Sequence, residues 1–245
     1  MSSYMLLLSN ACRSLTVICV ALFRIFQQAF ATLVVFVLLG STAMNSTAWD
    51  ADRIRLASYR QGAAQQESMR ALLDAVAAAS HLDDEARLQT LNQFFNRRVV
   101  FRDDIEVWGQ IDYWATPLEM IGRGEGDCED YAIAKYFSLV AAGVNPARMR
   151  LVYVKATLAG VAGAAQQAHM VLAYYGASGN ADPLILDNLI GEIRPASRRP
   201  DLLPVFSFNT EGLWSGTQGP GAGDPVSRLS RWRDLLARAR EQGFM

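Results

Sequence analysis

Cysteine and histidine are scarce in this sequence. Its 245 residues include three cysteines and two histidines, and Cys128 is the only cysteine beyond residue 19. A lone cysteine cannot form an internal disulfide, which excludes a disulfide-rich scaffold for most of the chain. The unpaired thiol is therefore either an inert buried group or a reactive one.

Long apolar runs and a strong net charge are also missing. The formal net charge is −1, so no excess charge favours binding to nucleic acid or to an acidic substrate. The apolar run at residues 30–39 is shorter than the ~20 residues that a membrane helix needs. No internal repeat or long linker divides the sequence, and its length predicts one sizeable core, or a core with a small additional lobe.

The N-terminal segment has the composition of an export signal. Residues 1–48 contain two arginines and no acidic residue, and they end in Ser46-Thr47-Ala48, which fits a cleavage site between small residues. We expect an export signal here, followed by a mature domain at residues 49–245. The alternative is an uncleaved membrane anchor that uses residues 15–39.

Hydrophobic spacing predicts helices at both ends of the mature domain. Residues 50–96 carry apolar residues at intervals of three and four, with a break at His81 and a capping aspartate at Asp83. Another helix is expected over residues 128–142. A last amphipathic helix would begin at Asp224-Pro225.

A strand period replaces the helical one after residue 149. Residues 150–155, 168–175 and 184–189 read as strands. A helix followed by an antiparallel set of strands predicts an α+β fold. Residues 198–223, which are rich in proline and glycine, are expected to form a surface loop.

The motif Gly126-Asp127-Cys128-Glu129-Asp130-Tyr131 places the thiol at the predicted start of a helix. Asp127 is a suitable N-cap, which leaves Cys128 in the first turn. Unpaired backbone N–H groups and the positive end of the helix dipole favour a thiolate there. The same groups could bind an oxyanion after attack on a carbonyl.

His169 and Asp187 complete a candidate catalytic set with Cys128. The imidazole would take the thiol proton, and the carboxylate would hold the imidazole in the right tautomer. Each residue also has a structural explanation, because a strand histidine is often buried and an aspartate often ends a strand. Zinc binding is a weaker reading, because no second cysteine or further histidine lies near these ligands.

The acids of the motif present an electrostatic difficulty. Asp127, Glu129 and Asp130 place negative charge beside the thiol, which raises its pKa. A bound hard cation would cancel that charge, and calcium suits an oxygen-only ligand set. The acids could equally do no more than cap the helix.

Several blocks of this chain stand in the order found in a known family. They are Asn96-Arg97-Arg98, Val107-Trp108-Gly109-Gln110, Asp112-Tyr113-Trp114-Ala115-Thr116-Pro117, the Cys128 motif, Ala134-Lys135-Tyr136-Phe137, Gln167-Ala168-His169-Met170-Val171 and Leu186-Asp187-Asn188. Together they resemble the bacterial transglutaminase-like cysteine proteinases, specifically the LapG-type periplasmic proteases. The resemblance covers roughly residues 85–215.

The resemblance implies a papain-like fold of the transglutaminase kind. The helix of Cys128 would pack on an antiparallel sheet that carries His169 and Asp187. The reaction would be hydrolysis of a peptide bond through a thioester. The family depends on calcium, which implies metal binding by Asp127 and Glu129, with Asp130 as a further ligand.

The same resemblance implies a substrate, a partner and a compartment. The substrate would be a large surface adhesin, cut in its N-terminal retention region next to a pair of alanines. Cleavage would release the adhesin and disperse a biofilm. An inner-membrane receptor for cyclic di-GMP would sequester the protease when that messenger is abundant. The expected compartment is the periplasm, in agreement with an export signal.

The oxyanion donors and two other functions remain open. We expect the Cys128 backbone N–H to be one donor, with the Trp108 indole or the Gln110 amide as candidates for the second. A transglutaminase-type acyl transferase would use the same three catalytic residues with an amine as acceptor. A non-catalytic periplasmic binding module would use the aromatic loop to hold a partner.

Overall fold

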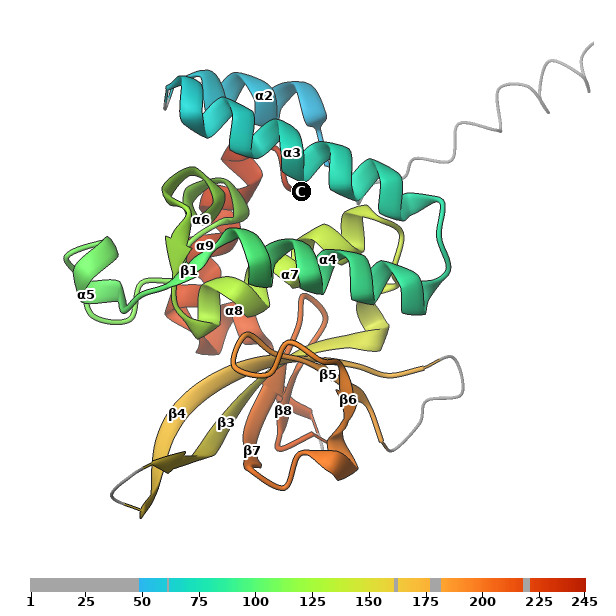
Figure 1. The fold of residues 1–245 in the computed structure, drawn as a ribbon, viewed down its shortest axis with the longest axis vertical. Helices are drawn as coiled ribbons and strands as arrows, with labels where there is room; N and C mark the ends of the chain where they lie inside the picture. The colour runs from blue at the N-terminus through green and yellow to red at the C-terminus, as the bar shows by residue number, and fades with distance from the viewer. Residues whose placement is uncertain (1–48, 61, 161–162, 177–181, 218–220) are drawn as a thin grey trace, which may run out of the picture. The chain divides into compact units, whose positions relative to one another are not determined.

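Helices cover one face of an antiparallel sheet in this protein (Figure 1). The computed structural model describes residues 49–60, 62–160, 163–176, 182–217 and 221–245. The predicted export signal at residues 1–48 lies outside the described residues. Within the described part of the chain, no helix is both long and apolar enough to cross a membrane.

The element order is helical first and strand-rich afterwards. The helices are α2 (Ala51–Tyr59), α3 (Ala63–Ser80), α4 (Asp84–Arg98), α5 (Asp104–Val107), α6 (Pro117–Arg123), α7 (Cys128–Ala141), α8 (Pro225–Arg228) and α9 (Ser230–Gln242), with single 3₁₀ turns at Pro146–Arg148 and Ala196–Arg198. The strands are β1 (Val100–Phe101), β2 (Glu125–Gly126), β3 (Met149–Gly160), β4 (Gly163–Tyr174), β5 (Leu184–Leu186), β6 (Arg194–Pro195), β7 (Leu202–Phe208), β8 (Leu213–Ser215) and β9 (Gly221–Gly223).

The predicted break between the first long helices is confirmed. Helix α3 ends at Ser80, and the Asp83 carboxylate caps α4 by accepting the Ala86 N–H at 2.9 Å. Both helices bury one apolar stripe, which includes Leu72 of α3 and Leu91 of α4. This pattern is what amphipathic helices adopt when one face covers a core.

Helix α7 forms the centre of the molecule. Every residue from Asp130 to Leu139 is buried, because α7 packs between α4 and strand β4. Its observed range, Cys128–Ala141, agrees closely with the predicted one. Gly143 follows it with a φ of 96°, a left-handed conformation that favours glycine and ends helices.

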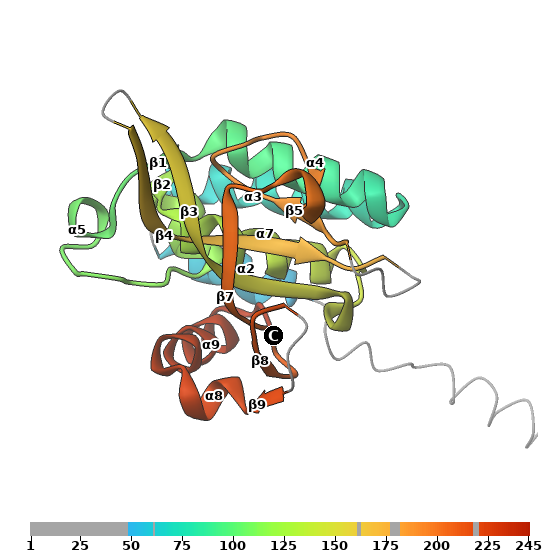
Figure 2. The same ribbon diagram turned by 90° about the horizontal axis from the view of Figure 1, so that it is seen from below.

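The main sheet has seven strands in the order β6-β5-β4-β3-β7-β8-β9. Each neighbouring pair is antiparallel, and Figure 2 shows α7 behind the strands of this sheet. The arrangement confirms the predicted α+β fold with the cysteine-bearing helix packed on an antiparallel sheet. Strands β3 and β4 are longer than predicted, and β5 is shorter.

The expectation that residues 198–223 form a surface loop is wrong. This segment contains β7, β8 and β9, and β7 pairs with β3. Phe206 of β7 stacks on Tyr153 of β3, with ring centroids 5.1 Å apart. Pro204 conceals the strand in the sequence, because proline is tolerated only at edges and irregularities of a sheet. It lies beside a register shift, opposite Val154.

The C-terminal helix appears where it was predicted, but in two pieces. Asp224 caps the short helix α8, and α9 begins after Leu229. The described ends of the domain also meet. The Asp50 N–H donates to the Gly243 carbonyl at 2.8 Å, and Trp49 packs edge-to-face on Phe244.

Trp232 fixes α9 to the rest of the core. Its side chain is 0% exposed and contacts Tyr136, Phe137 and Phe208. Replacing Trp232 with alanine should lower the free energy of unfolding by about 3–5 kcal/mol, because a large cavity remains. Urea unfolding measures this change. The neighbouring Arg233 is exposed, so Arg233→Ala should stay within about 0.5 kcal/mol of the wild type.

Candidate active site

The N-terminus of α7 holds Cys128 in a tightly packed turn. The Asp127 carboxylate caps the helix by accepting the backbone N–H groups of Glu129 and Asp130, as predicted. Gly126 precedes the cap in β2. A Cβ atom at Gly126 would lie 2.8 Å from Asp130 Oδ2, so only glycine fits there without displacing that carboxylate.

The Cys128 thiol is hydrogen-bonded to the carboxylate of its neighbour. Its Sγ donates to Glu129 Oε2 at 2.6 Å. Burial raises the pKa of the thiol far above its usual range, and the charges of Glu129 and Asp127 raise it further. A hydrogen bond from the Met170 backbone N–H acts in the opposite direction. The electrostatic difficulty anticipated from the sequence is therefore present in the fold.

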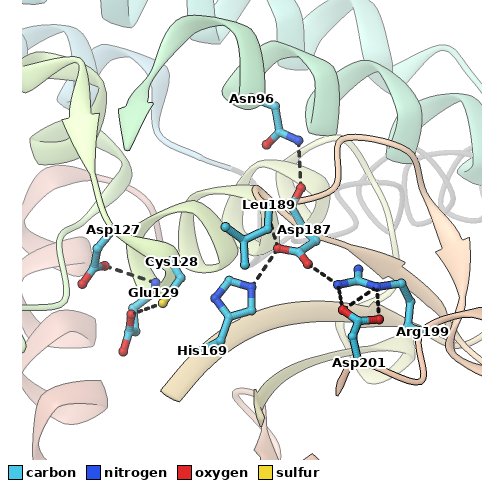
Figure 3. A network of polar contacts seen from close by, with 9 residues as sticks. All are labelled: Asn96, Asp127, Cys128, Glu129, His169, Asp187, Leu189, Arg199 and Asp201. Atoms are coloured by element: carbon cyan, nitrogen blue, oxygen red, sulfur yellow. Dashed lines mark hydrogen bonds and ion pairs between the residues drawn. The ribbon is translucent and has the colours of Figure 1, made fainter. Parts of the chain in front are cut away.

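His169 and Asp187 are brought together by neighbouring strands. His169 lies in β4 and Asp187 directly follows β5. His169 Nε2 is 2.8 Å from Asp187 Oδ1, and the side chains are 2% and 0% exposed. Figure 3 shows the imidazole between Cys128 and Asp187. Because Nε2 is bonded to the carboxylate, Nδ1 is the nitrogen left to exchange a proton with the thiol.

Asp187 is held in place by several donors. Its Oδ1 also accepts the Leu189 N–H at 3.0 Å, and its Oδ2 accepts Arg199 Nη2 at 2.7 Å. Burial alone would raise the pKa of Asp187, but the bonds from His169, Leu189 and Arg199 outweigh it and lower the pKa to about 2. The carboxylate is thus an anion at neutral pH, which suits a group that orients an imidazole.

Two residues to which the sequence analysis gave no role, Arg199 and Asn96, also hold Asp187 in place. Asp201 binds the Arg199 guanidinium through both of its oxygens, at 3.0 and 2.8 Å. Asn96 Nδ2 donates to the Asp187 backbone carbonyl at 2.8 Å (Figure 3). Asn96 stood in a block that carried the family resemblance, but no role was assigned to it. Arg199 had no signal, because it lay in a segment expected to be a loop.

A cluster of three carboxylates lies behind the thiol. Oxygens of Asp104, Asp127 and Asp130 lie within 4.8 Å of one another. Burial is the main cause that raises the pKa of Asp104 to about 6 and that of Asp127 to about 10. Asp104 Oδ1 and Asp130 Oδ2 are buried and have no hydrogen-bond partner among the described residues. These partnerless oxygens fit a hard cation, which prefers six to eight oxygen ligands.

The cluster differs from the predicted metal ligands in one member. Asp127 and Asp130 belong to it, but Glu129 does not, because its carboxylate turns to the Cys128 thiol. Asp104 takes the third position. It reaches the cluster from the start of α5, and its Oδ2 accepts the Tyr113 N–H.

Comparison with known proteins agrees with this geometry. Residues 58–201 match the model of the family described as bacterial transglutaminase-like cysteine proteinases. The chain belongs to this family. Among curated proteins, no match is found.

Solved structures of Legionella pneumophila LapG are similar to this proteinase. One LapG structure is 34% identical, with a TM-score of 0.65 over 78% of this chain and 98% of LapG. An EGTA-treated LapG is 35% identical, with a TM-score of 0.67 and the same coverage. A calcium-bound LapG is 35% identical, with a TM-score of 0.65 over 77% of this chain and 98% of LapG.

The two candidate oxyanion side chains, Trp108 and Gln110, have surroundings that the structure describes. The Trp108 ring packs on Tyr113 at 4.9 Å and under the Arg123 guanidinium at 5.4 Å. Gln110 is exposed in the loop after α5. No hydrogen bond among the described residues connects either side chain with Cys128. Their oxyanion role stays a prediction.

Lys135 of α7 is a further ionisable group near Asp187. It is 0% exposed, and its Nζ has no hydrogen-bond partner among the described residues. The ammonium lies 5.5 Å from the centre of the Tyr131 ring. Burial lowers the pKa of Lys135 to about 7, and the charge of Asp187 opposes part of that shift.

Arg199→Met should lower kcat/KM for peptide cleavage by the proteinase about tenfold to a hundredfold. The substitution keeps the volume but removes the donor that fixes Asp187 Oδ2, so the carboxylate no longer holds His169 in one orientation. Steady-state cleavage rates measure the effect. Arg194→Met is the matched control, because Arg194 forms its ion pair with the exposed Glu192. Equal rates for both variants would contradict the positioning role of Arg199.

Lys135→Met should stabilise the protein in a pH-dependent way. Below about pH 7 the lysine is protonated in both the folded and unfolded states, so folding bears the full cost of burying the charge. As the pH rises from about 7 to 10.5, the folded lysine loses its proton and this cost disappears. The variant should therefore gain a few kcal/mol below pH ~7, and the gain should shrink towards alkaline pH.

Urea unfolding of both proteins across this pH range tests the Lys135 prediction. Lys155→Met is the control, because Lys155 is exposed and its replacement should change little at any pH. A stability gain for Lys135→Met that does not vary with pH would exclude a desolvated ammonium as its cause.

Proposed function

We propose that this protein is a cysteine endopeptidase with the catalytic residues Cys128, His169 and Asp187. The observation that supports this most is the single imidazole between the thiol and a carboxylate (Figure 3). Its Nε2 is fixed by Asp187 at 2.8 Å, so Nδ1 faces the thiol. Separate elements supply each group, and buried donors hold the carboxylate.

The proposed reaction uses each group in turn. Cys128 passes its proton to His169 Nδ1, and the thiolate attacks the carbonyl carbon of the scissile peptide bond. The carbon–nitrogen bond then breaks, and His169 gives the proton to the leaving amine. Water hydrolyses the thioester with His169 as the base. The Cys128 backbone N–H, which has no hydrogen-bond partner among the described residues, would donate to the oxyanion.

Glu129 opposes this reaction as the fold stands. Its carboxylate accepts a hydrogen bond from the thiol and helps to raise the pKa of Cys128. We propose that Asp104, Asp127 and Asp130 hold a calcium ion, as the oxygens without partners in that cluster suggest. When bound, the ion would cancel negative charge beside Cys128 and so favour the thiolate. The calcium-bound structure of the similar LapG supports this choice of metal.

The biological setting is proposed from the family. We propose a periplasmic protein whose substrate is a large surface adhesin, cut next to a pair of alanines in its N-terminal retention region. Its release would disperse a biofilm, and an inner-membrane cyclic-di-GMP receptor would restrain the protease. The likeness to LapG over 98% of that chain supports this setting, and so does the predicted export signal.

Cleavage of an adhesin fragment tests the proposal. The purified protein is mixed with a fragment that contains a di-alanine site, with calcium or with EGTA. Two fragments should appear only with calcium, and Cys128→Ala should lower the rate by at least about 10⁴-fold. Asp104→Asn should require more calcium than the wild type, whereas Asp103→Asn, an exposed neighbour, should not.

Product mass separates the other two functions. A fragment joined to an added amine would indicate acyl transfer of the transglutaminase type. A fragment that binds but stays whole in every condition would indicate a binding module, and the endopeptidase proposal would then be wrong.

A further inference from the structure

Strand β4 has an uncovered edge beside the active site. It pairs with β3 over its whole length, from Tyr174 to Gly163. On its other side, β5 covers only Leu172, Ala173 and Tyr174. Figure 1 shows the β3–β4 hairpin running well past β5. The outer edge of β4 is therefore unpaired from Met170 towards the hairpin tip, among the residues that the structure describes.

Two hydrogen bonds fix which backbone groups point outward from this edge. In an antiparallel pair, residues alternate between those that bond their partner strand and those that face away from it. The Tyr175 N–H donates to the Arg148 carbonyl at 2.8 Å, which continues the β4–β3 register. Odd-numbered residues of β4 therefore bond β3, and even-numbered residues face outward.

A hydrogen bond near the tip of the β3–β4 hairpin also indicates that the even-numbered residues of β4 face away from β3. Thr157 of β3 stands opposite Gln166 of β4, but its N–H donates at 2.8 Å to the Asp201 carbonyl, on the side of β7. The Thr157–Gln166 pair is therefore not hydrogen-bonded. The part of the outward row of β4 that β5 leaves uncovered includes Gln166, Ala168 and Met170.

This outward row leads directly to the nucleophile. The backbone of Met170, the next outward-facing residue after Ala168, lowers the pKa of the Cys128 thiol, so the sulfur lies close to the same edge that β5 covers further along. Gln166 and Ala168 are exposed, and none of the described residues provides a partner for their backbone N–H groups. The row thus offers free donors and acceptors that end at the thiol.

We propose that the β4 edge at Gln166 and Ala168 binds the substrate as an extended polypeptide strand, hydrogen-bonded backbone to backbone. The proposal rests on the proposed endopeptidase function and adds how its substrate is held. Strand addition to an open edge gives affinity through main-chain bonds and places alternate side chains on the two faces. This mode of binding requires the substrate polypeptide to be unfolded around its scissile bond.

The position of the thiol limits this pairing to one side of the scissile bond. In the opposite direction along β4, the row at Leu172 and Tyr174 is occupied by β5, and Asp187 lies at the end of β5. A substrate strand cannot continue there. Residues on one side of the bond should therefore pair with β4, and residues on the other side should not.

N-methylation of substrate peptides tests the pairing. A synthetic peptide that spans the cut di-alanine bond is methylated at one backbone nitrogen at a time, and kcat/KM is measured with calcium. Losses of about tenfold or more should occur at every second residue on one side of the bond, because only alternate N–H groups face β4. Losses that do not alternate, or no losses, would overturn the proposal.

A substitution in the edge itself provides the second measurement. Gln166→Pro removes an outward N–H without removing a β3–β4 ladder bond. It should raise KM for the peptide about tenfold relative to Gln166→Ala, which loses the same side chain. Alkylation of Cys128 by iodoacetamide should proceed equally in both variants. Equal KM values would contradict the proposed edge.

Amide exchange separates this inference from the proposed function. Cys128→Ala cannot form a thioester, so its amide protons are followed with the same peptide bound. Protection of the Gln166 and Ala168 amides supports the edge even if the wild type cuts nothing, in which case only the endopeptidase function fails. Cleavage by the wild type without such protection refutes the edge and leaves the endopeptidase intact.

Discussion

The crowding of carboxylates at the buried start of α7 is the constraint on which this site depends. Asp127 must cap the helix, and Asp104 and Asp130 lie within 4.8 Å of it. Like charges in a buried place repel one another, so such a cluster is costly without a counter-ion. The same charges raise the pKa of the neighbouring thiol. Helix capping, the proposed metal site and the pKa of the Cys128 thiol are thus linked in one turn.

Around Asp187, in contrast, nearby donors compensate the negative charge of the carboxylate. Asp187 is buried, but Arg199 forms an ion pair with it and His169 is hydrogen-bonded to it, and its pKa falls to about 2. Both carboxylate oxygens of Asp187 thus have hydrogen-bond partners in the protein. In the cluster at α7, Asp104 Oδ1 and Asp130 Oδ2 have none among the described residues. Lys135 adds a positive charge on the Asp187 side. The imidazole lies between these two electrostatic environments.

The sequence predicted the parts of the site that depend on local rules. The cap at Asp127, the helix from Cys128 and the strand positions of His169 and Asp187 follow from capping and periodicity, which short segments encode. Asp104 could not be found in this way, because its contribution depends on how the loop after β1 folds back onto α7. Arg199 was missed for the same reason, since Pro204 concealed the strand that positions it.

The meeting of the two described ends determines how the domain can be tethered. Trp49 packs on Phe244, so a segment that precedes Trp49 and one that follows Phe244 leave the domain at the same place. Figures 1 and 2 place the C-terminus away from the tip of the β3–β4 hairpin. A membrane tether or a fused partner at either end would therefore leave the open edge of β4 accessible to a passing chain.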